Sequence, residues 1–89
     1  METTLVKQPW YLYIVQCSDE SLYTGITTDL ARRVREHNRG TGARSLRGKR
    51  PVRLVYHETY TNVGEARKRE YAIKQWPREN KIKLILAKE

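Results

Sequence analysis

Residues 10–26 read WYLYIVQCSDESLYTGI, and this stretch decides the fold. Its first part, WYLYIVQC over residues 10–17, is aromatic and β-branched, which is typical of a β-strand. A polar turn at residues 18–20 separates it from a second strand expected over residues 21–26, so the two form a hairpin. The run WYLYIV is apolar nearly throughout, as expected of a central strand that is covered on both faces.

The rest of the chain predicts three helices and a third strand. The expected elements are helices over about 29–38, 63–76 and 78–88, a third strand over 52–60, and a loop over 39–51 with room for one helical turn at 43–47. Thr27, Thr28 or Asp29 can cap the first helix, and Asn62 with Glu65 has capping-box spacing before the second. The order strand, strand, helix, strand, helix, helix predicts a small α/β (α+β) fold, in which helices flank a three-stranded mixed or antiparallel sheet. Residues 1–89 are expected to form a single domain.

The composition indicates a polyanionic partner. Eighteen Lys and Arg stand against ten Asp and Glu, a formal net charge of +8, and this balance is typical of proteins that bind nucleic acid. No apolar run reaches the roughly 18 residues of a membrane span. The first eight residues lack a secretory pattern, and the lone Cys17 excludes an internal disulfide. We therefore expect a cytoplasmic protein with no membrane contact.

Basic residues are concentrated between the first helix and the third strand. Residues 30–57 hold nine Lys and Arg and a single acid, Glu36. A solvated basic face without a partner is one interpretation. Arginine dominates the stretch, however, and its guanidinium fork matches phosphate oxygens, which favours nucleic acid. The candidate contacts are Arg32, Arg39, Arg44, Arg47, Lys49 and Arg50.

Three polar side chains fall on helix faces that are otherwise apolar. Glu70 shares its face with three apolar residues, where a lone carboxylate is costly unless it is paired or binds a metal. Arg33 and His37 lie one turn apart on the inner stripe of the first helix. The structural alternatives are a salt bridge for Glu70 and an amphipathic helix whose edge carries two polar groups.

The two strands of the predicted hairpin carry three tyrosines and a glycine that could belong to a functional site. Tyr11 and Tyr13 share one face of the first strand and Tyr23 lies on the second, although tyrosine is also common in strand cores. Gly25 is unusual, because glycine weakens a strand unless another backbone or a ligand approaches closely. Together these residues place hydroxyl, guanidinium, imidazole and carboxylate groups on elements that can converge.

This constellation resembles the GIY-YIG nuclease domain, and most closely its small single-domain bacterial branch of mostly uncharacterised proteins. The first family motif corresponds to residues 11–13 (YLY) and the second to residues 23–25 (YTG). Arg33 matches the family arginine, His37 a histidine found in many members, and Glu70 the metal-binding glutamate. The resemblance covers residues 10 to about 80.

The sequence departs from the family pattern at three places. Tyr11 replaces the name-giving glycine of the first motif, and Thr24 replaces the isoleucine of the second. Many members carry an asparagine after the glutamate; Asn80 is the nearby candidate, but it lies about two residues too close to Glu70, so it receives no assigned role.

The resemblance implies a metal-dependent endonuclease that hydrolyses phosphodiester bonds in DNA or another nucleic acid. Glu70 would hold one Mg²⁺ or Mn²⁺ ion, bound well only with substrate present, and Arg33 would hold the phosphate. Tyr13, Tyr23 or His37 would activate the water: an unperturbed tyrosine pKa near 10 is high for a base, whereas that of histidine is near 6.5. These three candidates stay open at this point.

Two other functions compete with a nuclease. A nucleic-acid-binding module could keep the nuclease scaffold with weak or partner-dependent catalysis, and a partner protein could then supply specificity. A basic structural or ribosome-associated protein has only its charge as support, and it leaves Glu70 on an apolar helix face unexplained.

Overall fold

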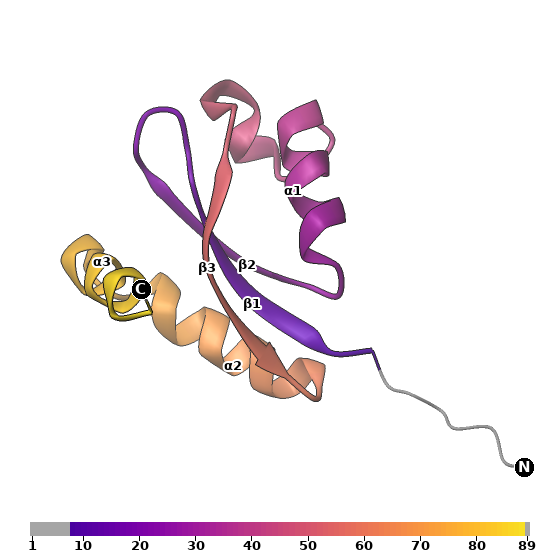
Figure 1. The fold of residues 1–89 in the computed structure, drawn as a ribbon, viewed down its shortest axis with the longest axis vertical. Helices are drawn as coiled ribbons and strands as arrows, with labels where there is room; N and C mark the ends of the chain where they lie inside the picture. The colour runs from indigo at the N-terminus through magenta and orange to yellow at the C-terminus, as the bar shows by residue number, and fades with distance from the viewer. Residues whose placement is uncertain (1–7, 89) are drawn as a thin grey trace, which may run out of the picture.

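A computed structural model describes residues 8–88, and its centre is a three-stranded antiparallel sheet (Figure 1). The elements along the chain are β1 (Trp10–Gln16), β2 (Leu22–Thr27), α1 (Leu30–Arg39), the 3-10 helix η1 (Arg44–Lys49), β3 (Arg53–Tyr60), α2 (Val63–Lys74) and α3 (Arg78–Ala87). The predicted order and fold class are confirmed, and the sheet is antiparallel rather than mixed. No helix in the described part of the chain is long and apolar enough to cross a membrane.

The strand predicted to be central is central. β1 lies between β2 and β3, and Tyr13 is opposite Gly25 on one side and His57 on the other. The register with β3 shifts between Ile14 and Val15, where β3 carries one residue more than β1. Because β1 pairs on both sides, its position fixes where the side chains of both neighbouring strands lie.

Local capping signals set the helix ends. Asp29 caps α1 by accepting a hydrogen bond from the backbone of Arg32, and Asn62 caps α2 through the backbone of Glu65. Gly40 ends α1 in the left-handed region, at φ 86°, which favours glycine. α2 ends at Lys74, two residues before its predicted end, because the residue that precedes Pro77 is biased away from helical geometry.

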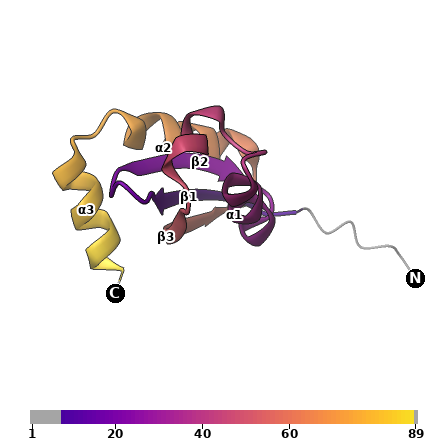
Figure 2. The ribbon, with the colours of Figure 1, turned by 90° about the horizontal axis from the view of Figure 1, so that it is seen from above.

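Helices cover both faces of the sheet. α1 and η1 lie on one face, and α2 and α3 lie on the other (Figures 1 and 2). Alternate residues of β1 pack on opposite faces of the sheet, since successive side chains of a strand point in opposite directions. Tyr13 and Val15 therefore pack under α1 and η1, whereas Leu12 and Ile14 pack under α2 and α3.

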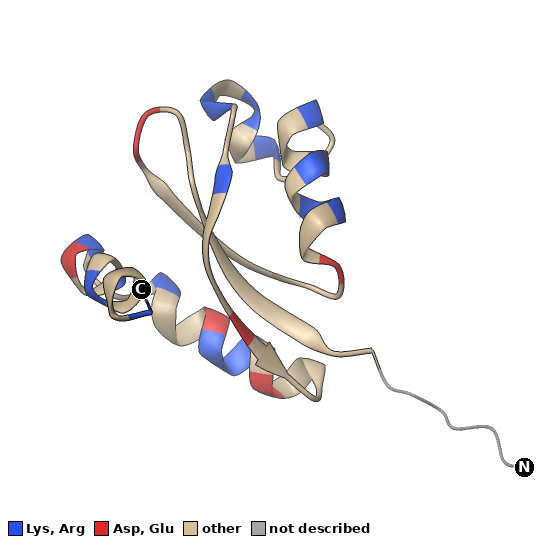
Figure 3. Ribbon diagram, in the orientation of Figure 1, with Lys and Arg blue, Asp and Glu red and all other residues tan. Residues whose placement is uncertain are grey.

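The charged residues are unevenly distributed over these elements. Lys and Arg dominate α1 and η1, whereas the turn between β1 and β2 is acidic (Figure 3). The predicted basic stretch thus forms the outer surface of one layer of the fold.

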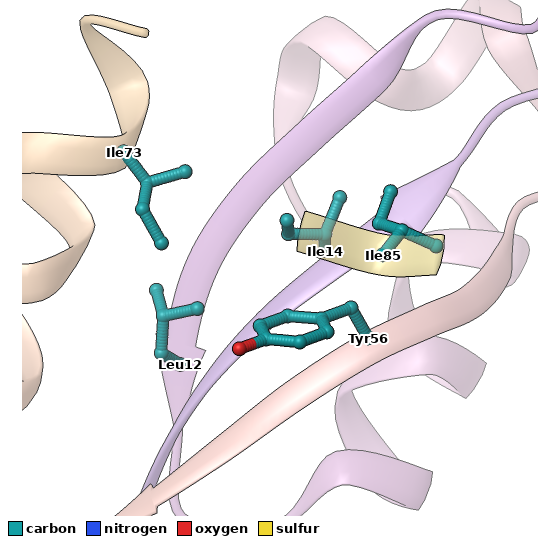
Figure 4. Close-up of a cluster of buried hydrophobic side chains, with 5 residues drawn as sticks. All are labelled: Leu12, Ile14, Tyr56, Ile73 and Ile85. Carbon is teal, nitrogen blue, oxygen red and sulfur yellow. The ribbon is translucent and has the colours of Figure 1, made fainter. Parts of the chain in front are cut away.

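The larger apolar cluster lies beneath α2 and α3. Leu12 and Ile14 of the central strand meet Tyr56, Ile73 and Ile85 there (Figure 4). Leu12, Ile14 and Ile73 have no exposed surface, and burial of such side chains contributes about 1.5–3 kcal/mol each to folding. This cluster places α2 against the sheet, and with it the face that carries Glu70.

A partly buried ion pair fixes α2 against β3. Arg69 donates two hydrogen bonds to the Glu58 carboxylate, at 2.9 and 3.0 Å, and the hydroxyls of Tyr56 and Tyr60 donate to the same group. Burial opposes ionisation of Glu58, but these donors outweigh it and lower its pKa. Since Arg69 directly precedes Glu70, this pair also fixes the rotation of the helix that presents Glu70.

Candidate active site

Tyr13 lies at the centre of the site, in a space that Gly25 leaves open. A Cβ atom at position 25 would lie 2.7 Å from the Tyr13 hydroxyl oxygen, a distance that real Cβ contacts essentially never show. The unusual strand glycine therefore makes room for a side chain of the neighbouring strand, not for a ligand. Only 1% of Tyr13 is exposed, and this burial raises the pKa of its hydroxyl to about 12, although the nearby Arg33 guanidinium acts in the opposite direction.

His37 is the direct partner of Tyr13. The Tyr13 hydroxyl lies 2.8 Å from His37 Nε2, and the backbone N–H of Ala43 donates to His37 Nδ1 at 3.2 Å. The imidazole is 1% exposed, and its pKa is lowered by burial and then by the positive charge of Arg33. Both ring nitrogens are thus occupied by protein groups.

The aromatic rings form a compact cluster. Tyr23 makes an edge contact with His37, with ring centres 5.5 Å apart, and lies 6.4 Å from the Tyr13 ring. Tyr23 is half-buried, whereas Tyr13 is enclosed. The hairpin therefore presents one enclosed and one accessible hydroxyl on the same side of the sheet.

Arg33 lies one turn before His37 and remains accessible. Its Nη1 atom donates to the Glu36 carboxylate at 3.0 Å, and 31% of the side chain is exposed. Burial disfavours its charge, but the interactions with Tyr13 and Glu36 raise its pKa further, so it is a cation at every relevant pH. A guanidinium held by one carboxylate retains free N–H groups for a second anion.

Glu70 reaches the same region from α2. Lys74 binds it at 3.1 Å, and the Lys74 ammonium also lies 6.0 Å from the centre of the Tyr23 ring. The Glu70 charge also contributes to the raised pKa of Tyr13. The salt bridge considered from sequence therefore exists, but it lies beside the tyrosine pair, and 22% of the Glu70 side chain is exposed.

The predicted nucleic-acid contacts lie together on α1 and η1. Five of the six are exposed, and the half-buried Lys49 lies 4.0 Å from Asp19. Arg50 also has a structural role, because its guanidinium donates to the carbonyls of Arg47 and Asn38. These side chains lie outside the cluster around Tyr13 and do not contribute to it. Asn80 is exposed on α3, and no contact joins it to the cluster within residues 8–88.

Sequence reasoning missed the residues that hold the loop against His37. Asn38 exchanges two hydrogen bonds with the backbone of Val52, at 2.7 and 3.0 Å, and so closes the segment between them. Gly42 packs on the imidazole so closely that a Cβ atom would lie 2.4 Å from Nδ1. The only signal in the sequence was the Gly-Thr-Gly run over residues 40–42, directly after the helix.

Comparison with known proteins assigns this arrangement to a family. A family model described as the GIY-YIG catalytic domain matches residues 9–83. The chain belongs to this family.

Proteins similar to this GIY-YIG chain occur in distant organisms. The UPF0213 protein DP2720 of Desulfotalea psychrophila is 57% identical over 81 residues, which are 90% of this chain and 74% of that one. The UPF0213 protein HQ_3675A of Haloquadratum walsbyi is 57% identical over 74 residues, 83% of each chain. The resemblance found in the motifs is thereby confirmed at the level of the family.

Two similar proteins have solution NMR structures. The UPF0213 protein BH0048 of Bacillus halodurans superposes with a TM-score of 0.60 at 41% identity, covering 90% of this chain and 85% of that one. The protein EF2693 of E. faecalis has a TM-score of 0.62 at 36% identity, covering 98% and 90%. Both likenesses support the fold described above for this GIY-YIG domain.

The close fit of Tyr13 over Gly25 generates a stability prediction. Gly25→Ala should lower the free energy of unfolding by about 1–3 kcal/mol, because the added methyl group overpacks against the Tyr13 hydroxyl. Gly48→Ala is the matched control, since a Cβ atom there has no neighbour within 4 Å. Urea unfolding of both variants measures the difference. Equal stabilities would contradict the packing described here.

Proposed function

We propose that this GIY-YIG chain is a metal-dependent endonuclease that hydrolyses phosphodiester bonds in nucleic acid, with DNA as the expected substrate. The supporting observation is the convergence around Tyr13: His37 Nε2 lies 2.8 Å from its hydroxyl, the Arg33 guanidinium is adjacent, and the Glu70 charge acts on it. Phosphodiester hydrolysis needs a proton acceptor, positive charge on the phosphate and a positioned ion, and each has a candidate in this cluster.

Glu70 is the candidate metal ligand. No group of three His, Cys, Asp or Glu side chains that could hold an ion occurs within residues 8–88, and Glu70 is the carboxylate that α2 brings to this region. One carboxylate suits Mg²⁺, which usually keeps several waters and takes substrate phosphates as further ligands. Such an ion stabilises the leaving oxygen when bound. Because Lys74 competes for Glu70 at 3.1 Å, the affinity for Mg²⁺ or Mn²⁺ should be weak until phosphate oxygens complete the shell.

Arg33 is the candidate phosphate ligand. Its partner Glu36 engages one Nη atom, which orients the guanidinium and leaves other N–H groups free. These can hold two non-bridging phosphate oxygens at once, as the more compact ammonium of lysine cannot. The outer basic residues of α1 and η1 would contact phosphates further along the strand, which makes binding salt-dependent.

Tyr13 is the best-supported proton acceptor of the three candidates. Tyr13 and His37 are equally buried, but His37 uses both ring nitrogens within the protein and so has no free lone pair for a water molecule. Tyr13 has hydrogen-bonding and cationic neighbours at its oxygen, His37 and Arg33, and such neighbours stabilise a phenolate. Tyr23, which is more accessible, would orient the water.

A binding module with weak or partner-dependent catalysis is the second candidate. Its support is the Glu70–Lys74 ion pair, which gives the carboxylate a structural partner, together with the exposed arginines of α1 and η1. In this case a further protein would supply specificity or activity.

The role of Glu70 can be tested by removing its charge. Glu70→Gln should lower Mg²⁺-dependent cleavage of DNA by about 100-fold or more, as expected for loss of a direct contribution to the transition state. Binding of the same DNA should change little, because the basic surface is intact. Glu65→Gln, an exposed carboxylate on the same helix, is the matched control and should leave cleavage unchanged.

Cleavage by Glu70→Gln at the rate of the unmodified chain would contradict the assignment. DNA binding that is sensitive to salt, with no cleavage by any of the three proteins, would favour the binding module.

The pH dependence distinguishes the tyrosine from the histidine. The pKa of Tyr13 is about 12. At any pH below this value, each increase of one pH unit raises the fraction of phenolate tenfold. Single-turnover cleavage should therefore accelerate steadily from pH 6.5 to 9. Tyr13→Phe should remove most of the rate across this range. A base at His37, whose pKa lies below its ordinary value, would instead give a constant rate above about pH 6.5.

A further inference from the structure

The turn at residues 40–43 contacts the His37 ring on the side away from Tyr13. Gly40 ends α1 with a positive φ, and the backbone N–H groups of Gly40, Thr41 and Gly42 donate to carbonyls in the last turn of that helix. The next backbone N–H, that of Ala43, points instead at His37 Nδ1, at 3.2 Å. The turn is thus built around one hydrogen bond to a buried ring nitrogen.

This hydrogen bond determines which ring nitrogen of His37 carries the proton. A backbone N–H can only donate, so Nδ1 has to be the unprotonated acceptor. The proton of the neutral imidazole is then on Nε2, which lies 2.8 Å from the Tyr13 hydroxyl. Nε2–H donates to the Tyr13 oxygen, and the hydroxyl cannot donate its own proton back to His37.

We propose that the Gly40–Ala43 turn is a positioning element of the site, which holds His37 as a neutral Nε2–H donor to Tyr13. This inference rests on the proposed role of Tyr13 as proton acceptor. When Tyr13 ionises, its proton leaves to solvent, Nε2–H remains on His37, and the hydrogen bond to the resulting phenolate becomes charge-assisted. His37 is therefore neither the base nor a relay for the proton of Tyr13.

The surroundings of His37 support a neutral ring. The groups that face it are Tyr13 from β1, Tyr23 from β2, and Arg33 with Glu36 from its own helix. If Nδ1 were protonated, its N–H would point at the backbone N–H of Ala43, and these two donors would repel each other. Burial and the charge of Arg33 lower the pKa of His37 in the same direction, and Glu36 opposes them.

Gly42 is the residue that permits this arrangement. A Cβ atom there would lie 2.4 Å from Nδ1 and 2.9 Å from the backbone nitrogen of His37. Both neighbours belong to a rigid ring or to a helix, so the turn has to move away from the imidazole to admit a methyl group. Gly42→Ala should therefore disrupt the hydrogen bond between Ala43 and His37. Gly48→Ala is the control, because a Cβ atom at position 48 has no neighbour within 4 Å.

The test is nitrogen-15 NMR of the full-length chain, without metal or nucleic acid. The chain has two histidines, the buried His37 and the exposed His57, so two sets of imidazole signals are expected. His37 should show a protonated Nε2 and an unprotonated Nδ1 at pH 7 to 8. In Gly42→Ala its tautomers should mix, and its pKa should rise toward the ordinary value of about 6.5. Gly48→Ala should leave the His37 signals unchanged.

A protonated Nδ1 in the unmodified chain would overturn the proposal, and so would unchanged His37 signals in Gly42→Ala. The spectrum of the unmodified chain decides the question even where Gly42→Ala does not fold. Cleavage assays distinguish failure of the proposed nuclease function from failure of the inference about the turn. If the predicted tautomer is found but no cleavage occurs, the proposed function fails and the turn retains its described role. If Glu70→Gln abolishes cleavage but His37 carries Nδ1–H, the proposed function stands and this inference fails.

Discussion

The buried hydroxyl of Tyr13, in the middle of the central strand, is the constraint on which the arrangement of the rest of the site depends. β1 is covered on both faces, so the Tyr13 side chain is only 1% exposed and its hydroxyl has its hydrogen-bond partner inside the fold. Gly25 provides the space and His37 the partner. His37 is itself buried, and the turn that packs on its imidazole supplies the donor for Nδ1, the Ala43 backbone N–H. The two hydrogen bonds between the Asn38 side chain and the Val52 backbone then close the segment that carries this turn.

Local patterns in the sequence predict the elements well, because their causes are local. The aromatic and β-branched run of β1, the Asp29 cap and the Asn62 cap each depend on neighbours within four residues. The Glu70–Lys74 pair is of the same kind, at helical spacing. For Gly25 the sequence correctly indicates a close approach, but the group that approaches is Tyr13, which depends on the strand register.

The part of the site that sequence could not reveal is joined over long separations. Tyr13 and His37 are 24 residues apart, and Asn38 reaches Val52 across 14 residues. No spacing rule connects such residues: the Tyr13 and His37 side chains meet because of how α1 packs on the sheet, and Asn38 binds backbone atoms of Val52, which any residue could provide. The double role of Arg50 was hidden for the same reason: its guanidinium binds carbonyl oxygens, which any residue could provide.

The charges near the site are arranged so that arginines are oriented without being neutralised. Glu36 holds Arg33 through one nitrogen on one face of the sheet, whereas the bidentate pair of Glu58 with Arg69 fixes the helix of Glu70 on the other face. The net charge is +8, and exposed arginines of α1 and η1 lie over the face of the sheet that carries Tyr13. In the proposed function this positive surface would attract the polyanionic substrate. The proposed function therefore depends on whether a metal ion binds Glu70 beside these residues.

Mn²⁺-induced line broadening in NMR spectra, recorded with bound DNA that resists cleavage, tests this claim most directly. Amide signals next to Glu70, Gly25 and Tyr13 should broaden first, and Glu70→Gln should abolish the effect. Broadening centred on the acidic turn between β1 and β2, or broadening that persists unchanged in Glu70→Gln, would contradict the account.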